Sequence, residues 1–311
     1  MNFTFLFITK DRKSFSKSLM NCLQQVRKFN KIKIIIVDGN KDNRIEKYLS
    51  ENNLFHKNLS IVKQSKGKFV RACLIGLSNL ETDFFTFMHD DDYISPNFYE
   101  LIEFAIKKNS SVIGNGIVLP KKEEEFNFTE IKNYKLFSSK EILNKYFCSI
   151  KIENKFLPAN PACSVFKKDI VDIWKSSLKM VLKNKFISSY IIHKNIGQDL
   201  LLYLVTLSVQ KEIFYCTDYT CQFSSHKDSM SVNFGSHNLG VGYWLAKKIY
   251  TRFSGKNFVY KTSFLENINL FIRGLIYCFK QGLNKKKFHF HSNKKLLEQI
   301  INYKKIEIDN I

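Results

Sequence analysis

The chain has 311 residues, and 44% of them are apolar, which is enough to bury the core of one large α/β domain, so we do not expect global disorder. The formal net charge is +21, from 49 Lys and Arg against 28 Asp and Glu, an excess that can indicate nucleic acid, anionic lipid or acidic substrates. With 4 Pro, 12 Gly and abundant Lys, Asn, Ile and Phe, the composition also has the bias of AT-rich coding DNA, and without a nucleic-acid-binding motif we do not expect nucleic acid as a partner.

The first ninety or so residues alternate between apolar runs and amphipathic segments. The apolar runs, which predict strands, are residues 3–8, 31–39, 59–64 and 84–88. The segments between them, which predict helices, are residues 14–29, 43–54 and 67–79. Strand and helix in regular alternation predict a parallel sheet with right-handed crossovers.

Polar residues stand where three of these strands end. Thr9 follows the first apolar run, Asp38 closes the second, and the aspartates from Asp90 onward follow the fourth. Parallel sheets bind ligands where their strands end, at the carboxyl edge. One crevice is therefore expected to collect these residues.

Beyond residue 97 the alternation is looser. The expected elements are a helix over 97–109, a strand over 111–120, an exposed segment over 121–135, a Pro-containing loop leading into a short strand over 157–170, and a helix over 196–209. From about residue 237 the chain becomes helical, basic and aromatic. Its seven cysteines are scattered and form no CxxC pair, as is typical of reduced thiols. With no signal-peptide pattern and no apolar run long enough to span a bilayer, we expect a cytoplasmic protein.

Three consecutive aspartates, Asp90 to Asp92, end the apolar run FFTFM. Neighbouring carboxylates repel and raise one another's pKa, so such a cluster needs a compensating partner. One interpretation is a solvated turn whose aspartates cap the helix that begins near Asn97. The other is a divalent cation, whose charge offsets the repulsion and which prefers carboxylate oxygens.

Five motifs, in order, resemble those of the family 2 glycosyltransferases, which have the GT-A fold. FITKDR stands where the family has a strand ending in Pro-Thr-x-Asn-Arg, and IIIVDGNKD stands for its Val-Asp-Asp-Gly-Ser-x-Asp. GKFVRACLIGL stands for its Gly-x-x-x-Ala-Arg-Asn helix, and FMHDDDYISP for its Leu-Asp-x-Asp-Asp-x-x-x-Pro. GQDLLLY stands for a later acidic motif, commonly Glu-Asp. The resemblance covers roughly residues 3–235.

This resemblance implies an α/β GT-A domain over residues 1–236, with a donor half over about 1–97 and an acceptor half over about 98–236, followed by a helical, basic C-terminal extension over 237–311. It implies an inverting transfer of a sugar from a nucleotide donor, expected to be uridine-linked, to a glycan in surface polysaccharide or lipopolysaccharide synthesis. The implied cofactor is Mn²⁺ or Mg²⁺, which neutralises the charge of the diphosphate leaving group.

Counting back from Pro96 places the family's Asp-x-Asp on His89, Asp90 and Asp91, so a histidine replaces the first aspartate. The resemblance therefore implies Asp91 as the main metal ligand. Asp92 supports the turn and is the second candidate ligand, and Asp90 faces the ribose or the donor sugar. A shifted register, in which Asp90 and Asp92 form the pair, stays open.

Asp199, in the motif GQDLLLY, matches the family's base position. A positioned carboxylate can take the proton of an acceptor hydroxyl as that hydroxyl attacks the anomeric carbon. The alternative is an aspartate that only benefits from the dipole of a helix N-terminus. His226, in the Ser-rich segment CQFSSHKDSMS, is a further candidate contact for the metal or the diphosphate.

Recognition of the nucleotide is expected from the first strands. The resemblance implies that Asp38 accepts a hydrogen bond from the ring N–H of the base, and that Thr9 contacts the base or ribose. Arg71 would reach a phosphate or the aspartates, and Arg12 is a weaker candidate. Asp38 could instead belong to an ordinary strand-end turn, VDGN, and Arg71 to a solvated helix face.

Two other classes of protein stay open. A nucleotidyltransferase also uses aspartates and a divalent ion, but it usually has a glycine-rich loop after the first strand, and TKDRKS contains no glycine. A catalytically inactive GT-A-like binding protein would explain His89 as a loss of metal binding.

The C-terminal residues 264–295 combine an apolar helical face with a Lys-rich run. The face consists of Leu265, Ile268, Phe271, Ile272, Leu275 and Phe279. Such a helix suits the anionic inner face of the cytoplasmic membrane, where a lipid-linked acceptor would be met. Packing on the enzyme core and a homodimer interface are the alternatives.

Overall fold

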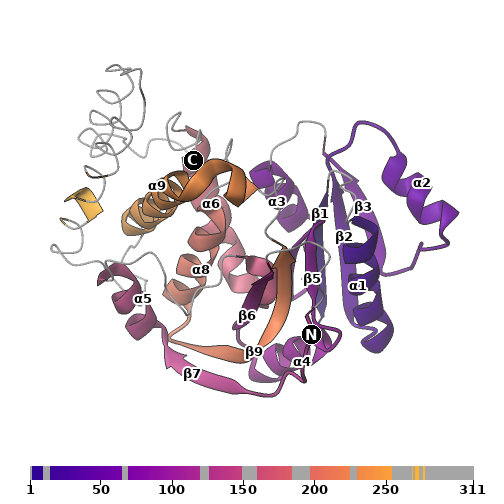
Figure 1. The fold of residues 1–311 in the computed structure, drawn as a ribbon, viewed down its shortest axis with the longest axis horizontal. Helices are drawn as coiled ribbons and strands as arrows, with labels where there is room; N and C mark the ends of the chain where they lie inside the picture. Colours follow the sequence, from indigo (N-terminus) through magenta and orange to yellow (C-terminus); the bar gives the residue numbers. More distant parts are fainter. Residues whose placement is uncertain are drawn as a thin grey trace.

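The structure, a computed structural model, describes residues 2–9, 15–64, 69–119, 126–148, 160–183, 197–224 and 230–253, together with 268, 270–272 and 276. Helices flank two sheets, with α1 and α2 on one side of the view and α5, α6, α8 and α9 on the other (Figure 1). The fold is mixed α/β with a mostly parallel main sheet, as the sequence predicts.

The main sheet contains the four predicted strands and one short addition. Its strands are β1 (Phe3–Thr9), β2 (Ile32–Asp38), β3 (Leu59–Lys63), β4 (Phe84–His89) and β8 (Phe166–Lys167). They lie in the order β3-β2-β1-β4-β8, and all pairs are parallel except β4 with β8. The chain winds from β1 through β2 to β3 and then crosses to the other side of β1. The resulting reversal between β1 and β4 is the place where such sheets bind ligands.

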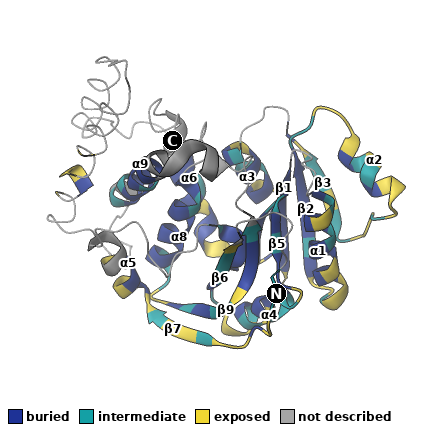
Figure 2. Cartoon of the chain, viewed as in Figure 1, coloured by how far each residue is buried: buried dark blue, intermediate teal, exposed yellow. Residues whose placement is uncertain are grey.

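Helices cover both faces of this sheet. α1 (Phe15–Lys28) and α2 (Arg44–Glu51) bury one face, which includes Phe5 and Phe7 of β1. α3 (Phe69–Ser78) packs on the opposite face, which includes Leu6 and Ile8. Every residue of β1 is therefore buried (Figure 2), which explains why the strand is a continuous apolar run instead of an alternating one.

A second sheet is formed by strands that follow the acidic turn. Its strands are β5 (Asp92–Ile94), β6 (Val112–Leu119), β7 (Tyr134–Ser138) and β9 (Glu212–Ser224), and α4 (Phe98–Lys108) connects β5 to β6. β9 is the central strand of this sheet, parallel to β6 and antiparallel to β5 and β7. The end of the segment predicted to be exposed thus joins a sheet edge as β7. β4 of the main sheet ends at His89 and β5 of the second sheet begins at Asp92, so the acidic turn lies between the two sheets.

The remaining elements pack beside the main sheet. They are α5 (Ser139–Cys148), η1 (Pro161–Cys163), η2 (Lys168–Ile170), α6 (Val171–Lys183), α8 (Gln198–Val209) and α9 (Met230–Phe253). α9 passes through residue 236, and its Trp244 and Tyr250 share one apolar core with α8. The indole N–H of Trp244 also donates to the carbonyl of Leu270 at 2.6 Å. The division of the chain at residue 236 stays a proposal.

Candidate active site

The strand ends meet at one edge of the main sheet, as predicted. In the register of the sheet Thr9 lies opposite Asp38, and Ile8 lies opposite His89. The amide of Gly39 donates to the carbonyl of Thr9 at 2.9 Å and joins the two strand ends. β1, β2 and β4 therefore bring their C-terminal residues into one region at the reversal of the sheet.

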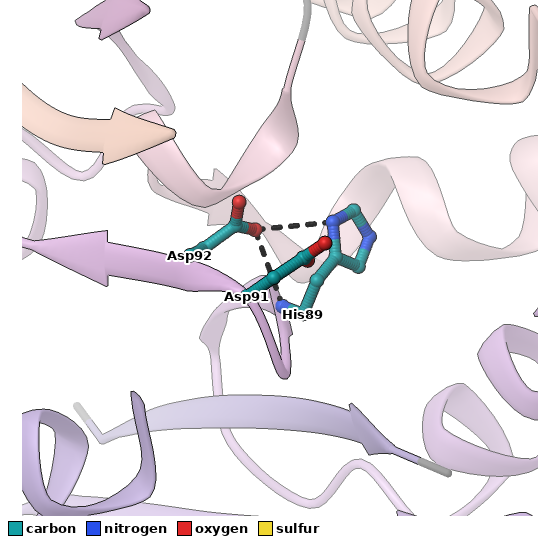
Figure 3. Close-up of side chains that lie close together, drawn as sticks. All are labelled: His89, Asp91 and Asp92. Atoms are coloured by element: carbon teal, nitrogen blue, oxygen red, sulfur yellow. Dashed lines mark hydrogen bonds and ion pairs between the residues drawn. The ribbon is translucent and has the colours of Figure 1, made fainter. Parts of the chain in front are cut away.

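The acidic turn connects β4 to β5, and Figure 3 shows the side chains of His89, Asp91 and Asp92. Oδ2 of Asp92 accepts hydrogen bonds from the backbone N–H of His89 at 3.3 Å and from Nδ1 of His89 at 3.0 Å. Oδ1 of Asp92 accepts from Nδ2 of Asn160 at 2.7 Å. Asp92 is 2% exposed, so the structure neutralises this buried carboxylate with several donors. Asn160, just before η1, is a site residue that the sequence did not reveal.

Three side chains could hold one cation. Ligand atoms of His89, Asp91 and Asp92 all lie within 4.8 Å of one another. Nε2 of His89 is buried and, among the residues that the structure describes, has no hydrogen-bond partner. One imidazole nitrogen and two carboxylates make a donor set that fits a divalent transition metal. The structure thus places His89 beside the predicted ligands Asp91 and Asp92.

The charges in this turn are coupled. Burial lowers the pKa of His89, but the charge and hydrogen bond of Asp92 outweigh burial, and with Asp199 and Asp91 they raise this pKa to about 9. In this arrangement the imidazole is a cation at neutral pH. A metal ion that binds through a nitrogen of His89 would have to replace its proton.

Asp90 points elsewhere in the site. Its Oδ2 accepts from the hydroxyl of Thr9 at 3.0 Å, and Asp90 is only 4% exposed. The two residues predicted to contact the donor, Thr9 and Asp90, are thus joined to each other across β1 and β4.

Asp38 is completely buried at the end of β2, and both of its oxygens have protein partners. Oδ1 accepts from the backbone and side-chain N–H groups of Asn40 at 2.8 and 2.7 Å. Oδ2 accepts from Lys63 at 2.7 Å, and Lys63 also contacts Glu46 at 2.8 Å. Partial burial lowers the pKa of Lys63, but the hydrogen bonds to Asp38 and Glu46 raise it by more. Lys63 was missed from sequence, although it ends β3 at the same edge.

Asp199 lies in the first turn of α8, where the helix dipole favours a negative charge. Gly197, the residue before α8, has φ +94°, and an added Cβ there would lie 2.3 Å from the carbonyl oxygen of Gly242 on α9. Only glycine permits this conformation and this close approach. Burial raises the pKa of Asp199 to about 6; the charge of His89 opposes this rise and that of Asp92 adds to it. The charges of Asp199 and His89 affect each other, which indicates that α8 carries Asp199 toward the acidic turn.

Three predicted site residues remain: Arg71, Arg12 and His226. Arg71 lies on α3 and is exposed. Arg12 and His226 lie outside the described residues, so their predicted roles stay predictions.

The mostly parallel sheet with helices on both faces, and the acidic turn at its carboxyl edge, match the GT-A fold of nucleotide-sugar-dependent enzymes. The chain belongs to glycosyl transferase family 2, whose sequence pattern matches residues 7–174, and it is a glycosyltransferase. A comparison with curated proteins finds no significant match.

Two solved structures of Staphylococcus aureus TarS residues 1–349 have the same fold. The one in complex with UDP-GlcNAc has a TM-score of 0.63 and 12% identity, over 97% of this chain and 81% of that one. The one described without a ligand has a TM-score of 0.59 and 12% identity, over 97% of this chain and 80% of that one.

Proposed function

We propose that the protein is an inverting, metal-dependent glycosyltransferase that takes a sugar from a UDP donor and passes it to a glycan acceptor. The proposal is supported by the His89–Asp91–Asp92 group at the edge of the main sheet and by the electrostatic interaction of His89 with the buried carboxylate of Asp199. In transfer from a diphosphate donor to a hydroxyl, a metal ion can stabilise the leaving diphosphate. A nearby carboxylate can accept the proton of the hydroxyl.

The cation would be held by His89, Asp91 and Asp92. When bound, it neutralises the charge that develops on the diphosphate leaving group. An imidazole ligand favours a transition metal over Mg²⁺, so Mn²⁺ is the expected ion of the two.

Asp199 acts as the general base in this proposal. Its carboxylate takes the proton of the acceptor hydroxyl as the oxygen forms a bond to the anomeric carbon. The bond between that carbon and the diphosphate breaks on the opposite face, and UDP leaves with the electron pair. One displacement of this kind inverts the anomeric centre.

The identity of the nucleotide rests on two supports. Asp38 stands where related enzymes contact uracil, and the similar TarS structure is a complex with UDP-GlcNAc. Thr9, Asp90, Arg12 and Arg71 are the remaining proposed donor contacts. For the acceptor we propose a growing surface polysaccharide or lipopolysaccharide.

The direct test measures UDP release from a panel of UDP-sugars, with Mn²⁺, with Mg²⁺ and with EDTA. We expect thermal stabilisation and slow donor hydrolysis with Mn²⁺, both lost with EDTA. Metal-dependent binding without hydrolysis or transfer would favour an inactive binding protein. Pyrophosphate formation from UTP and a sugar phosphate would identify a nucleotidyltransferase instead.

We also propose that the C-terminal extension meets the inner face of the cytoplasmic membrane. Ile268, Phe271, Ile272 and Ile276 are 38, 39, 49 and 46% exposed, whereas Leu270 is 2% exposed and is bonded to Trp244. Three members of the predicted apolar face, Ile268, Phe271 and Ile272, are thus open to solvent, as is Ile276 outside that face, whereas Leu270 is anchored to α9. Among the described helices, none is long and apolar enough to cross a bilayer.

Flotation with anionic vesicles at low salt tests this proposal in the full chain. Phe271→Asp should reduce vesicle binding. The control is Phe55→Asp, at a 57% exposed position beyond α2, which should not. If the unchanged protein does not float, or if both variants float equally well, the membrane role is wrong. Size-exclusion chromatography then shows whether the face forms a homodimer.

A further inference from the structure

A chain of buried and partly buried hydrogen bonds connects the helix of Asp199 to the acidic turn. Tyr203 lies on α8 four residues after Asp199, and hence on the same side of the helix. The Tyr203 hydroxyl donates to the carbonyl oxygen of Asn160 at 3.0 Å. Nδ2 of Asn160 donates to Oδ1 of Asp92 at 2.7 Å, and Oδ2 of Asp92 accepts from His89.

The tyrosine end of this chain has a defined direction. Tyr203 is fully buried, and burial raises the pKa of its hydroxyl well above the ordinary value, so it remains a donor. Oγ of Ser164 lies 2.9 Å from the Tyr203 hydroxyl and accepts from the amide of Gly114 at 3.0 Å. Because the tyrosine proton goes to Asn160, the serine hydroxyl donates to the tyrosine oxygen. Each hydroxyl then donates one hydrogen bond and accepts one. Hydrogen bonds in such a chain polarise one another, so each bond is stronger than it would be alone.

The asparagine in the middle is fixed on both sides. Its Oδ1 accepts from the amide of Ala162 at 2.9 Å, which caps the short helix η1. Its Nδ2 is directed at Asp92, and its carbonyl oxygen is held by Tyr203. Asn160 is thus the one link between α8 and the acidic turn within this chain of hydrogen bonds.

We propose that Tyr203 and Asn160 are positioning residues that hold α8, and with it Asp199, at a fixed distance from the acidic turn. This inference rests on the proposed role of Asp199 as the base. The acceptor oxygen, the base and the anomeric carbon must align, and a misplacement of about 1 Å can cost roughly 10²-fold in rate. The donor side of the site is built by β1, β2 and β4 and meets this link only at Asp92, so donor affinity is compared in the tyrosine variant, which leaves Asn160 and Asp92 intact.

The test uses Tyr203→Phe, which keeps the ring and removes the hydroxyl. We expect a folded protein with unchanged UDP and Mn²⁺ affinity by calorimetry and a kcat for transfer lowered by about 10-fold. In an Asp199→Asn background the same substitution should have no further effect on kcat, because no base is left to position. The control is Ser208→Ala, which removes a buried hydroxyl of α8 that donates to the carbonyl of Val205 at 2.7 Å.

A second variant tests the other end. In Asn160→Ser, the serine can still cap η1 but is too short to reach Asp92. Its kcat should fall as well, and the double variant with Tyr203→Phe should be no slower than the slower single variant, because both break one link.

The inference is overturned if Tyr203→Phe lowers kcat equally with and without Asp199, if neither variant lowers kcat, or if the UDP affinity of Tyr203→Phe falls in parallel with its rate. An unchanged rate in Asp199→Asn alone is a different result. It would refute Asp199 as the base, and the inference with it.

Discussion

Nδ1 of His89 lies 3.0 Å from Oδ2 of Asp92, so the histidine that replaces a family aspartate is paired with an aspartate three residues later. The pair keeps the imidazole in one orientation, as carboxylate partners do for metal-binding histidines. The imidazole of His89 is therefore oriented by the site. This argues against the interpretation that His89 marks a loss of metal binding.

Replacing His89 tests its part in the choice of metal. His89→Asp should shift the preference of the protein from Mn²⁺ toward Mg²⁺, because an oxygen ligand replaces a nitrogen ligand. Calorimetric titration of both ions, with and without UDP, measures the ratio of the two affinities. An unchanged ratio would show that the imidazole does not touch the metal.

Asp91→Ala should abolish metal-dependent UDP binding and should lower the free energy of unfolding less than the loss of Asp92 does, because Asp91 is partly exposed and Asp92 is buried. Asp92→Ala should also weaken metal binding, but it should lower the free energy of unfolding by about 1–3 kcal/mol, since buried donors of Asn160 and His89 lose their acceptor. Calorimetry and urea unfolding separate the two effects. Full metal-dependent binding in Asp91→Ala, with none in Asp92→Ala, would favour the shifted register of the motif.

Asp199→Asn should lower transfer by roughly 10²-fold or more and leave UDP affinity unchanged. It should also stabilise the protein at pH 7. The pKa of Asp199 is raised from 3.8 to about 6, so folding stability falls as pH rises from about 4 to 6 and stays lower above that range. Asn removes this cost, which reaches about 3 kcal/mol at pH 7. Near pH 3, where the carboxyl is protonated in both states, urea unfolding should show no such gain.

The pH dependence of transfer follows from the same group. A base works in its ionised form, so at a saturating Mn²⁺ concentration, where His89 holds the metal in place of its proton, kcat/KM should rise with pH up to about 6 and then level off. The acid limb should be missing in Asp199→Asn. If that variant keeps the limb, another group produces it.

Asp38 can be tested against its ion-pair partner, Lys63. If Asp38 recognises the base, Asp38→Asn weakens UDP binding by about 10-fold to 100-fold, the scale of a hydrogen bond to a charged group. Lys63→Met should lower stability and change UDP affinity much less. Equal UDP affinity in both variants and the unchanged protein would assign Asp38 to the strand-end turn alone.

Sequence alone determined the main parallel sheet of this protein and the helices that connect its strands. The four parallel strands and the helices between them follow from local apolar periodicity, which does not depend on distant contacts. Because parallel strands end at one edge, the sequence also predicted the convergence of Thr9, Asp38 and the acidic turn. β9 was not predicted; it is the central strand of its sheet, and its partners β5, β6 and β7 come from far earlier in the chain.

Tertiary structure alone decided how the site is connected. Asn160 reaches Asp92, Tyr203 reaches Asn160, and Lys63 reaches Asp38 across 68, 43 and 25 residues of chain. No local pattern encodes such pairs, because they depend on the register of strands and the packing of α8 against the sheet. The same packing buries Asp199, and burial, which a sequence does not show, raises its pKa toward the range of a working base.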